Sequence, residues 1–162
     1  MRGGAQFDPT ETYRYSLWRD FENGQASMLR FVMLNPSTAD AEQDDPTIRR
    51  CMGFARDWGF GGVLVVNLFA LRATNPRELR RHPDPIGPDN DSHIEWALQP
   101  GSSDGEPPLA LAAWGAHGEF MGRGKAVLRR YPFLRALGLT AAGEPRHPLY
   151  LRRDAVPVQV PS

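Results

Sequence analysis

The chain has 162 residues, and its 19 basic and 19 acidic side chains cancel to a formal net charge of zero. This length suits one hydrophobic core, so we expect a single domain, residues 1–162, with an ordered core at about 12–153. Zero net charge means that contact with a polyanion requires a local basic patch. The single cysteine, Cys51, excludes an intramolecular disulfide and an iron–sulfur cluster. Apolar runs such as Val63–Val66 are too short to span a membrane, so we expect a cytoplasmic protein without a membrane partner.

Residues 13–34 form the first pattern, because they alternate large apolar and polar residues in the stretch "YRYSLWRDFENGQASMLRFVML". Asn23-Gly24, near its centre, favours a tight two-residue turn. The pattern predicts an N-terminal hairpin. Its second strand, about Met28–Leu34, is apolar enough to lie centrally in a sheet.

A helix is predicted after the loop that begins at Asn35. Asp45 is a suitable N-cap, Pro46 suits the first helical position and Gly59 follows the end. Apolar residues fall on one helical face at Ile48, Cys51, Met52, Ala55 and Trp58. We expect this face to pack on a sheet.

Short apolar strands and helices alternate in the rest of the chain. The segments "GVLVVN" (62–67), "PLALAAWG" (108–115) and "LRALGLT" (134–140) predict strands, whereas Asp91–Leu98 and "KAVLRRY" (125–131) predict helices. This alternation predicts an α/β fold with a mostly parallel sheet covered by helices on both faces.

Polar and aromatic residues follow the predicted strands. The strands lead to Asn35-Pro36-Ser37, to Asn67-Leu68-Phe69, to Trp114-Gly115 and to the segment around His147. Each has a structural explanation by itself, since Asn before Pro is a common turn former and a Trp in an apolar strand usually belongs to the core. In open parallel sheets, however, ligands bind beyond the carboxyl ends of the strands. Together these residues therefore predict a ligand site on one rim of the sheet.

Two resemblances follow from these segments. In chain order, "FVMLNPST", "VLVVNLFALRATNP", "LALAAWG" and "PRHPLYLRR" resemble successive motifs of the uracil-DNA glycosylase superfamily. Over residues 12–153 the chain is also similar to a bacterial domain-of-unknown-function family, family 1643, whose recurring words include "NPSTAD", "DDPTIRRC" and "PRHPLYL". The first resemblance implies a three-layer α/β sandwich. It also implies a nucleobase-directed N-glycosidase that hydrolyses the glycosidic bond of a modified or mismatched pyrimidine in DNA.

The superfamily resemblance implies a role for each matching residue. Asn35 resembles the residue that holds the attacking water, and His147 resembles the histidine that donates to the base carbonyl as the bond breaks. Asn67 resembles the asparagine that binds the edge of the extruded base. Pro36, Ser37, Phe69 and Trp114 complete the implied substrate-binding set, and Pro148 resembles a backbone-fixing proline.

This chain also departs from the superfamily pattern. The first loop lacks the Gly-Gln-Asp-Pro-Tyr form of the most active branch, and Asn35 cannot act as a general base. The aromatic residue on which the base stacks has no clear counterpart, since Thr47 falls near that place and Phe69 is only a stand-in. These departures imply weak catalysis or a different substrate.

The amide of asparagine offers an acceptor and two donors, which match the mixed edge of uracil, thymine or a modified pyrimidine. A neutral His147 with its proton on the base-facing nitrogen suffices as the donor. For the phosphates of DNA or a nucleotide we expect contacts from Arg72, Arg146, Arg152 and Arg153. We expect no cofactor and no metal, and a monomeric protein.

Two other functional classes stay open. A non-catalytic module that binds nucleotide or nucleic acid would keep Asn67 and the arginines while tolerating loss of Asn35 and His147. A metal-dependent hydrolase would use Asp40, Asp44 and Asp45, but Asp45 is predicted to cap a helix and no histidine lies beside the others.

Overall fold

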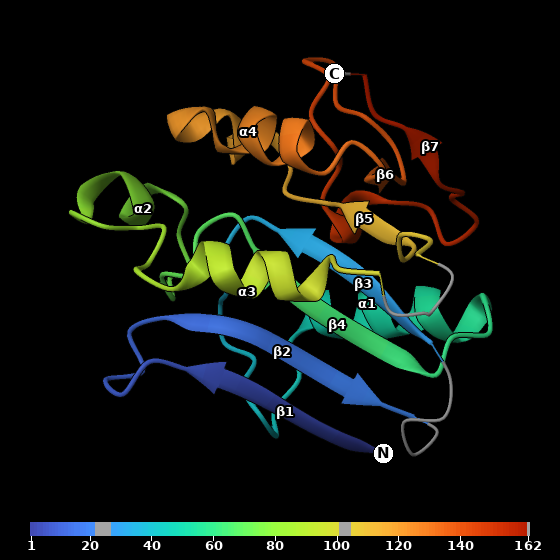
Figure 1. Ribbon diagram of the computed structural model, residues 1–162, viewed down its shortest axis with the longest axis horizontal. Helices are drawn as coiled ribbons and strands as arrows, with labels where there is room; N and C mark the ends of the chain where they lie inside the picture. Colours follow the sequence, from blue (N-terminus) through green and yellow to red (C-terminus); the bar gives the residue numbers. More distant parts are fainter. Residues whose placement is uncertain (22–26, 101–104, 162) are drawn as a thin grey trace.

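The computed structural model describes residues 1–21, 27–100 and 105–161, and these residues form a seven-stranded sheet with helices around it (Figure 1). The spatial order of the strands is β1 (Arg2–Phe7), β2 (Arg14–Asp20), β4 (Gly62–Asn67), β3 (Met28–Met33), β5 (Ala110–Ala112), β6 (Arg135–Ala136) and β7 (Val158–Gln159). The helices are α1 (Pro46–Asp57), α2 (Arg77–Arg81), α3 (Asn90–Ala97) and α4 (Arg123–Arg130). Two 3₁₀ segments, η1 (Ala116–Gly122) and η2 (Pro148–Tyr150), complete the secondary structure of the described chain.

The sheet is mixed, so the prediction of a mostly parallel sheet was wrong. Strands β4, β3, β5 and β6 are parallel neighbours, whereas β1, β2 and β7 each pair antiparallel to their neighbours. The parallel strands are joined through helices, as parallel strands must be. Strands β1 and β2 are joined directly by the turn at residues 8–13, which permits only antiparallel pairing.

The predicted hairpin between residues 13–20 and 28–34 was also wrong, because β4 lies between β2 and β3. Val65 of β4 pairs with Leu17 on one side and with Phe31 on the other. The turn residues Asn23-Gly24 lie outside the described residues. The N-terminal antiparallel pair is instead β1 with β2, and β1 lies before the predicted core. Strand β3 is apolar on both faces. It is therefore most stable where a strand pairs with each of its edges and helices cover both faces of the sheet.

Alternate side chains of the central strands enter two hydrophobic clusters, one on each face of the sheet. Phe31 and Val65 pack with the buried side of α1, whereas Val32 and Val66 pack with α3 and α4. Figure 1 shows α1 behind the sheet and α3 in front of it. The prediction that helices cover both faces is therefore confirmed.

Helix α1 forms as its sequence predicts. The Asp45 carboxylate accepts a hydrogen bond from the backbone N–H of Ile48 at 2.9 Å, Pro46 is the first helical residue and Gly59 follows with φ of 79°. The predicted helices in residues 91–98 and 125–131 correspond to α3 and α4. For α1, the cap, the proline and the apolar spacing were enough to locate the helix.

A close contact between Gly118 and Trp114 yields a prediction about stability. A Cβ atom on Gly118 would lie 1.9 Å from Cδ1 of Trp114, whose indole Nε1–H donates to Glu144 at 2.8 Å. We expect Gly118→Ala to lower the free energy of unfolding by about 1–3 kcal/mol, because the anchored ring cannot move aside. Urea denaturation measures this change.

The matched control is Gly53→Ala, in the middle of α1. No heavy atom lies within 4 Å of the position that a Cβ atom would take there, so the substitution should leave stability unchanged or raise it by about 0.5–1 kcal/mol. Equal losses in the two variants would contradict the predicted contact.

Candidate functional site

A cavity of about 440 Å³ opens at the carboxyl ends of β3, β4 and β5. Its lining combines these strand ends with the start of α1 and the segment that contains η2: Met33, Asn35, Ser37, Asp45, Thr47, Ile48, Asn67, Trp114, Gly115, His147, Leu149 and Tyr150, among others. The volume is in the range of sites that bind small molecules. The predicted rim of the sheet thus contains a cavity.

Asn67 ends β4 and is completely buried in the cavity wall. Its backbone carbonyl accepts a hydrogen bond from Asn90 Nδ2 at 2.9 Å. Its side-chain Nδ2 and Oδ1 atoms have no hydrogen-bond partner among the described residues. A buried polar group without a partner costs about 1–3 kcal/mol, so this amide is suited to a ligand that supplies both an acceptor and a donor.

Asn35, just beyond β3, is held by its amide nitrogen. Nδ2 donates to the carbonyl oxygens of Ala73 at 2.8 Å and of Pro36 at 3.1 Å. These bonds identify which end of the amide is nitrogen. No hydrogen bond from the described part of the chain reaches Oδ1, so this oxygen is an acceptor for a water or a ligand.

His147 is half-buried, and its tautomer follows from one hydrogen bond. Nδ1 accepts from the backbone N–H of Leu149 at 3.2 Å, so Nε2 holds the proton in the neutral ring. Burial lowers the pKa of His147 below its ordinary value of 6.5, although the Asp45 carboxylate acts in the opposite direction. The ring is therefore neutral near pH 7 and has a donor at Nε2.

Two backbone contacts hold the His147 segment against the strand ends. The N–H of Gly115, where φ is 75°, donates to the carbonyl oxygen of Pro145 at 2.7 Å. From α1, Arg50 donates to the carbonyl oxygen of Leu151. His147 thus reaches the cavity because β5 and α1 both bind the chain around it.

Arg14, at the start of β2, is a cavity residue that the sequence did not reveal. Only 2% of its surface is exposed, and Nη1 donates to the carbonyl oxygen of Ala39 at 2.9 Å. Burial lowers the pKa of Arg14 to about 10, so the side chain is still protonated at neutral pH. The sequence held no signal for this residue, since an arginine in an alternating strand is expected to face solvent.

Asp45 is the one carboxylate among the described residues that line the cavity. Oδ1 caps α1 through Ile48, and Oδ2 accepts from the backbone N–H of Ala39 at 3.3 Å. Both oxygens therefore hold the local backbone. Thr47 also lines the cavity, and Tyr150, 77% exposed, supplies an aromatic ring with its centroid 5.9 Å from that of His147.

Of the other predicted substrate-binding residues, two line the cavity and two do not. Ser37 lines the cavity, and so does Trp114, although the indole of Trp114 packs in the cluster under α3 and α4. Phe69 is fully buried against Phe120 and does not line the cavity. Pro36 is buried beside the site without lining it.

The four predicted phosphate-binding arginines lie outside the cavity lining. Arg72 stacks on the Phe7 ring at 4.9 Å, and Arg146 donates to the carbonyl oxygen of Leu139 at 3.0 Å. The last two form exposed ion pairs, Arg152 with Asp154 at 3.1 Å and Arg153 with Asp57 at 3.4 Å. Their surface positions leave all four able to contact solvent ions or a polyanion.

The aspartates of the metal hypothesis have other partners. Asp40 accepts from the backbone N–H groups of Glu42 and Gln43, and Asp44 pairs with Arg19 at 2.7 Å. In residues 1–21, 27–100 and 105–161, no three His, Cys, Asp or Glu side chains are grouped to hold a metal ion. None of the helices described has the length and apolar character needed to cross a membrane.

Comparison with known proteins gives one match. A family model described as "Protein of unknown function (DUF1643)" matches residues 14–149, which include Arg14, Asn35, Asn67 and His147. Neither the curated proteins nor the solved structures contain a match. The match covers most of the chain and its cavity, and the chain therefore belongs to the DUF1643 family.

Proposed function

We propose that the protein is a nucleobase-directed N-glycosidase that hydrolyses the glycosidic bond of a modified or mismatched pyrimidine in DNA. The observation that carries this proposal is that Asn35, Asn67 and His147 all line one cavity, and that each has a side-chain atom without a hydrogen-bond partner in the described part of the chain. The three residues are far apart in the sequence, and each has an unused atom of the kind that the reaction needs.

In this proposal Asn67 recognises the base. Its amide offers one acceptor and two donors, and the edge of uracil or thymine offers an N–H beside a carbonyl oxygen. A base inside a duplex cannot reach a cavity of this kind, so it must be extruded at a cost of a few kcal/mol. Arg72, which is partly buried, and the exposed Arg146, Arg152 and Arg153 are proposed to offset this cost by binding phosphates.

His147 and Asn35 act on the two charges that develop as the bond breaks. The electron pair of the C1′–N bond stays with the base, and Nε2–H of His147 donates to the base carbonyl, by analogy with an oxyanion-hole donor worth about 3 kcal/mol. Oδ1 of Asn35 orients a water that adds to the cationic sugar carbon and then loses its proton to solvent. Because the sugar cation attracts the water, positioning matters more than proton removal.

The resemblance of the four strand-end motifs to the uracil-DNA glycosylase superfamily supports this proposal. A three-layer fold like that of those enzymes is part of it. Support for that fold comes from the four adjacent parallel strands and from the helices on both faces of the sheet.

One observation favours the alternative, a non-catalytic module that binds a nucleotide or nucleic acid through the same cavity. Asp45, the single carboxylate among the described lining residues, uses both oxygens to hold backbone N–H groups. The cavity therefore has no carboxylate free to act as a general base. A binding module needs none.

The test is incubation with oligonucleotides that contain uracil, hypoxanthine, hydroxymethyluracil or mismatched thymine, followed by detection of alkali-labile abasic sites. We expect abasic sites with at least one pyrimidine lesion and fewer with His147→Ala. No abasic site at stoichiometric enzyme would contradict the glycosidase. Unchanged binding of the free base by His147→Ala, without turnover in either protein, would instead favour the module.

A further inference from the structure

Strand β2 contains two buried arginines that differ in their partners. Arg19 is 2% exposed, pairs with Asp44 at 2.7 Å and also donates to three backbone carbonyl oxygens. Arg14 is equally buried, but its side chain makes one hydrogen bond, to the carbonyl oxygen of Ala39, and its Nε has no partner. Within the described residues no carboxylate lies within 4 Å of the Arg14 guanidinium. Arg19 is thus a satisfied structural cation, whereas Arg14 is not.

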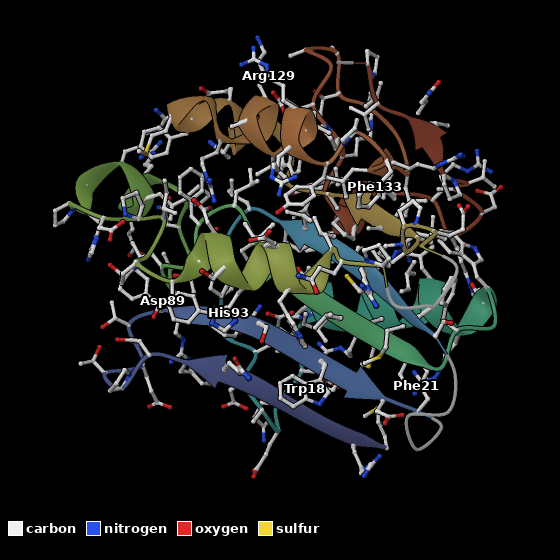
Figure 2. All side chains as sticks on the ribbon, in the orientation of Figure 1. Trp18, Phe21, Asp89, His93, Arg129 and Phe133 are labelled. Carbon is white, nitrogen blue, oxygen red and sulfur yellow. The ribbon has the colours of Figure 1, made fainter. Side chains whose placement is uncertain are left out.

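A β-bulge turns Arg14 toward the cavity. Ser16 pairs with Gln6 and Arg14 pairs with Phe7, so Tyr15 is an extra residue in β2. Tyr15 stacks on His93 of α3 with ring centroids 4.6 Å apart, and Figure 2 shows His93 on the α3 side of the sheet. The extra residue directs Arg14 to the opposite face, where Ala39 and the cavity lie. Bulges commonly redirect a side chain beside a functional site.

A buried cation without a directly paired counter-ion is unfavourable, because the interior replaces little of its lost hydration. The Asp45 carboxylate raises the pKa of Arg14, but burial lowers it by more, and Asp45 directs its oxygens to backbone N–H groups instead of pairing with the guanidinium. A negative charge bound in the cavity would add a direct partner. Asn67 also lines the cavity, and its buried, unpartnered amide suits a planar ring with an N–H next to a carbonyl.

We propose that Arg14 is a ligand-binding residue of this cavity, and that it binds the negative charge of an acidic oxo-heterocycle whose ring N–H is ionised. This inference rests on the proposed function, in which the base leaves as an anion when the glycosidic bond breaks. Arg14 then faces the electron pair that the base retains, while Asn67 binds the edge of the ring. The favoured ligands are therefore acidic oxo-pyrimidines and not amino-bases or simple phosphates.

The test is calorimetric titration of the wild-type protein with uracil, the more acidic 5-fluorouracil, cytosine and inorganic phosphate between pH 6 and pH 9. We expect 5-fluorouracil to bind more tightly than uracil, and the affinity of both to rise with pH as the ring ionises. Cytosine and phosphate should bind at least about 10-fold more weakly. Phosphate binding more tightly than either ring, or affinity independent of pH, would overturn the proposal.

Two variants separate a ligand-binding role from a structural one. Arg14→Met should weaken 5-fluorouracil binding at least about 10-fold and raise Tm by about 2–4 °C, because it removes a buried charge that has no direct ion-pair partner. Arg19→Met should lower Tm and keep the ligand preference. A lower Tm with unchanged ligand preference in Arg14→Met would make Arg14 structural and overturn the proposal. If Arg14→Met does not fold, the calorimetric titrations of the wild-type protein decide whether the proposal stands.

The two proposals can fail separately. If the protein binds the ligands with the predicted preference but forms no abasic site, hydrolysis is contradicted and the ligand-binding role of Arg14 still stands. Abasic sites formed equally fast by wild type and a folded Arg14→Met would contradict the role of Arg14 and leave the glycosidase in place.

Discussion

Asn67→Leu is expected to stabilise the protein and, under the proposed function, to weaken binding and hydrolysis of the base at the same time. Leucine has the same branched side-chain skeleton as asparagine and replaces two buried polar atoms that have no partner in the described chain. The free energy of unfolding should therefore rise by about 1–3 kcal/mol. Loss of two hydrogen bonds to the ligand should weaken binding of the base, and its hydrolysis, by about 100-fold. Urea denaturation and titration with free uracil measure the two effects.

Asn90→Leu is the matched control, because Asn90 is as completely buried as Asn67 and belongs to the neighbouring helix α3. Its Nδ2 donates to the carbonyl oxygens of Asn67 at 2.9 Å and of Leu68 at 3.1 Å. Removing this donor should lower the free energy of unfolding by about 1–3 kcal/mol. If Asn67→Leu destabilises the protein as Asn90→Leu does, the Asn67 amide is a structural group and the base-recognition role is contradicted.

His147→Ala should reduce the rate of base release by about 100- to 1000-fold, the usual effect of removing one donor from a preorganised site. The fold should be little affected, since the substitution removes one side-chain hydrogen bond, to Leu149, at a half-buried position. His147→Gln should retain part of the rate, because its amide group can still donate. Single-turnover rates on the responsive oligonucleotide provide the measurement. Equal rates for wild type and His147→Ala would contradict a catalytic role.

The pH profile checks which form of His147 acts. Burial lowers the pKa of His147 below 6.5, and in the neutral ring Nδ1 accepts from Leu149 while Nε2 donates. A histidine with a lowered folded pKa stabilises the fold above about pH 6.5, and this contribution is lost as the pH falls through the folded pKa. Activity should follow the same direction, full near pH 7 and lost on acidification. Activity that rises on acidification would mean that the charged ring acts.

Local signals located most of the helices and strands, because each signal acts within a few residues. The cap at Asp45, the proline at position 46 and the apolar spacing of α1 all act within one helix, and the structure has that helix. The apolar runs of β3, β4 and β5 likewise mark buried strands. Helix α2 and strands β1 and β7 were not predicted, since they are short or only partly buried and have no strong local pattern.

The sequence by itself determined which segments are strands and which polar residues follow them, so Asn35, Asn67 and His147 can be identified from the sequence alone. Strand partners were decided only by the tertiary structure, because pairing depends on long-range contacts: β4 lies between β2 and β3, where a local turn had predicted a hairpin. The tertiary structure also decided which of Arg14 and Phe69 lines the cavity. A one-residue bulge turns Arg14 into the cavity, and packing against Phe120 takes Phe69 out of it. The face to which a side chain points depends on register and on what packs against it, and neither is visible in a single stretch of sequence.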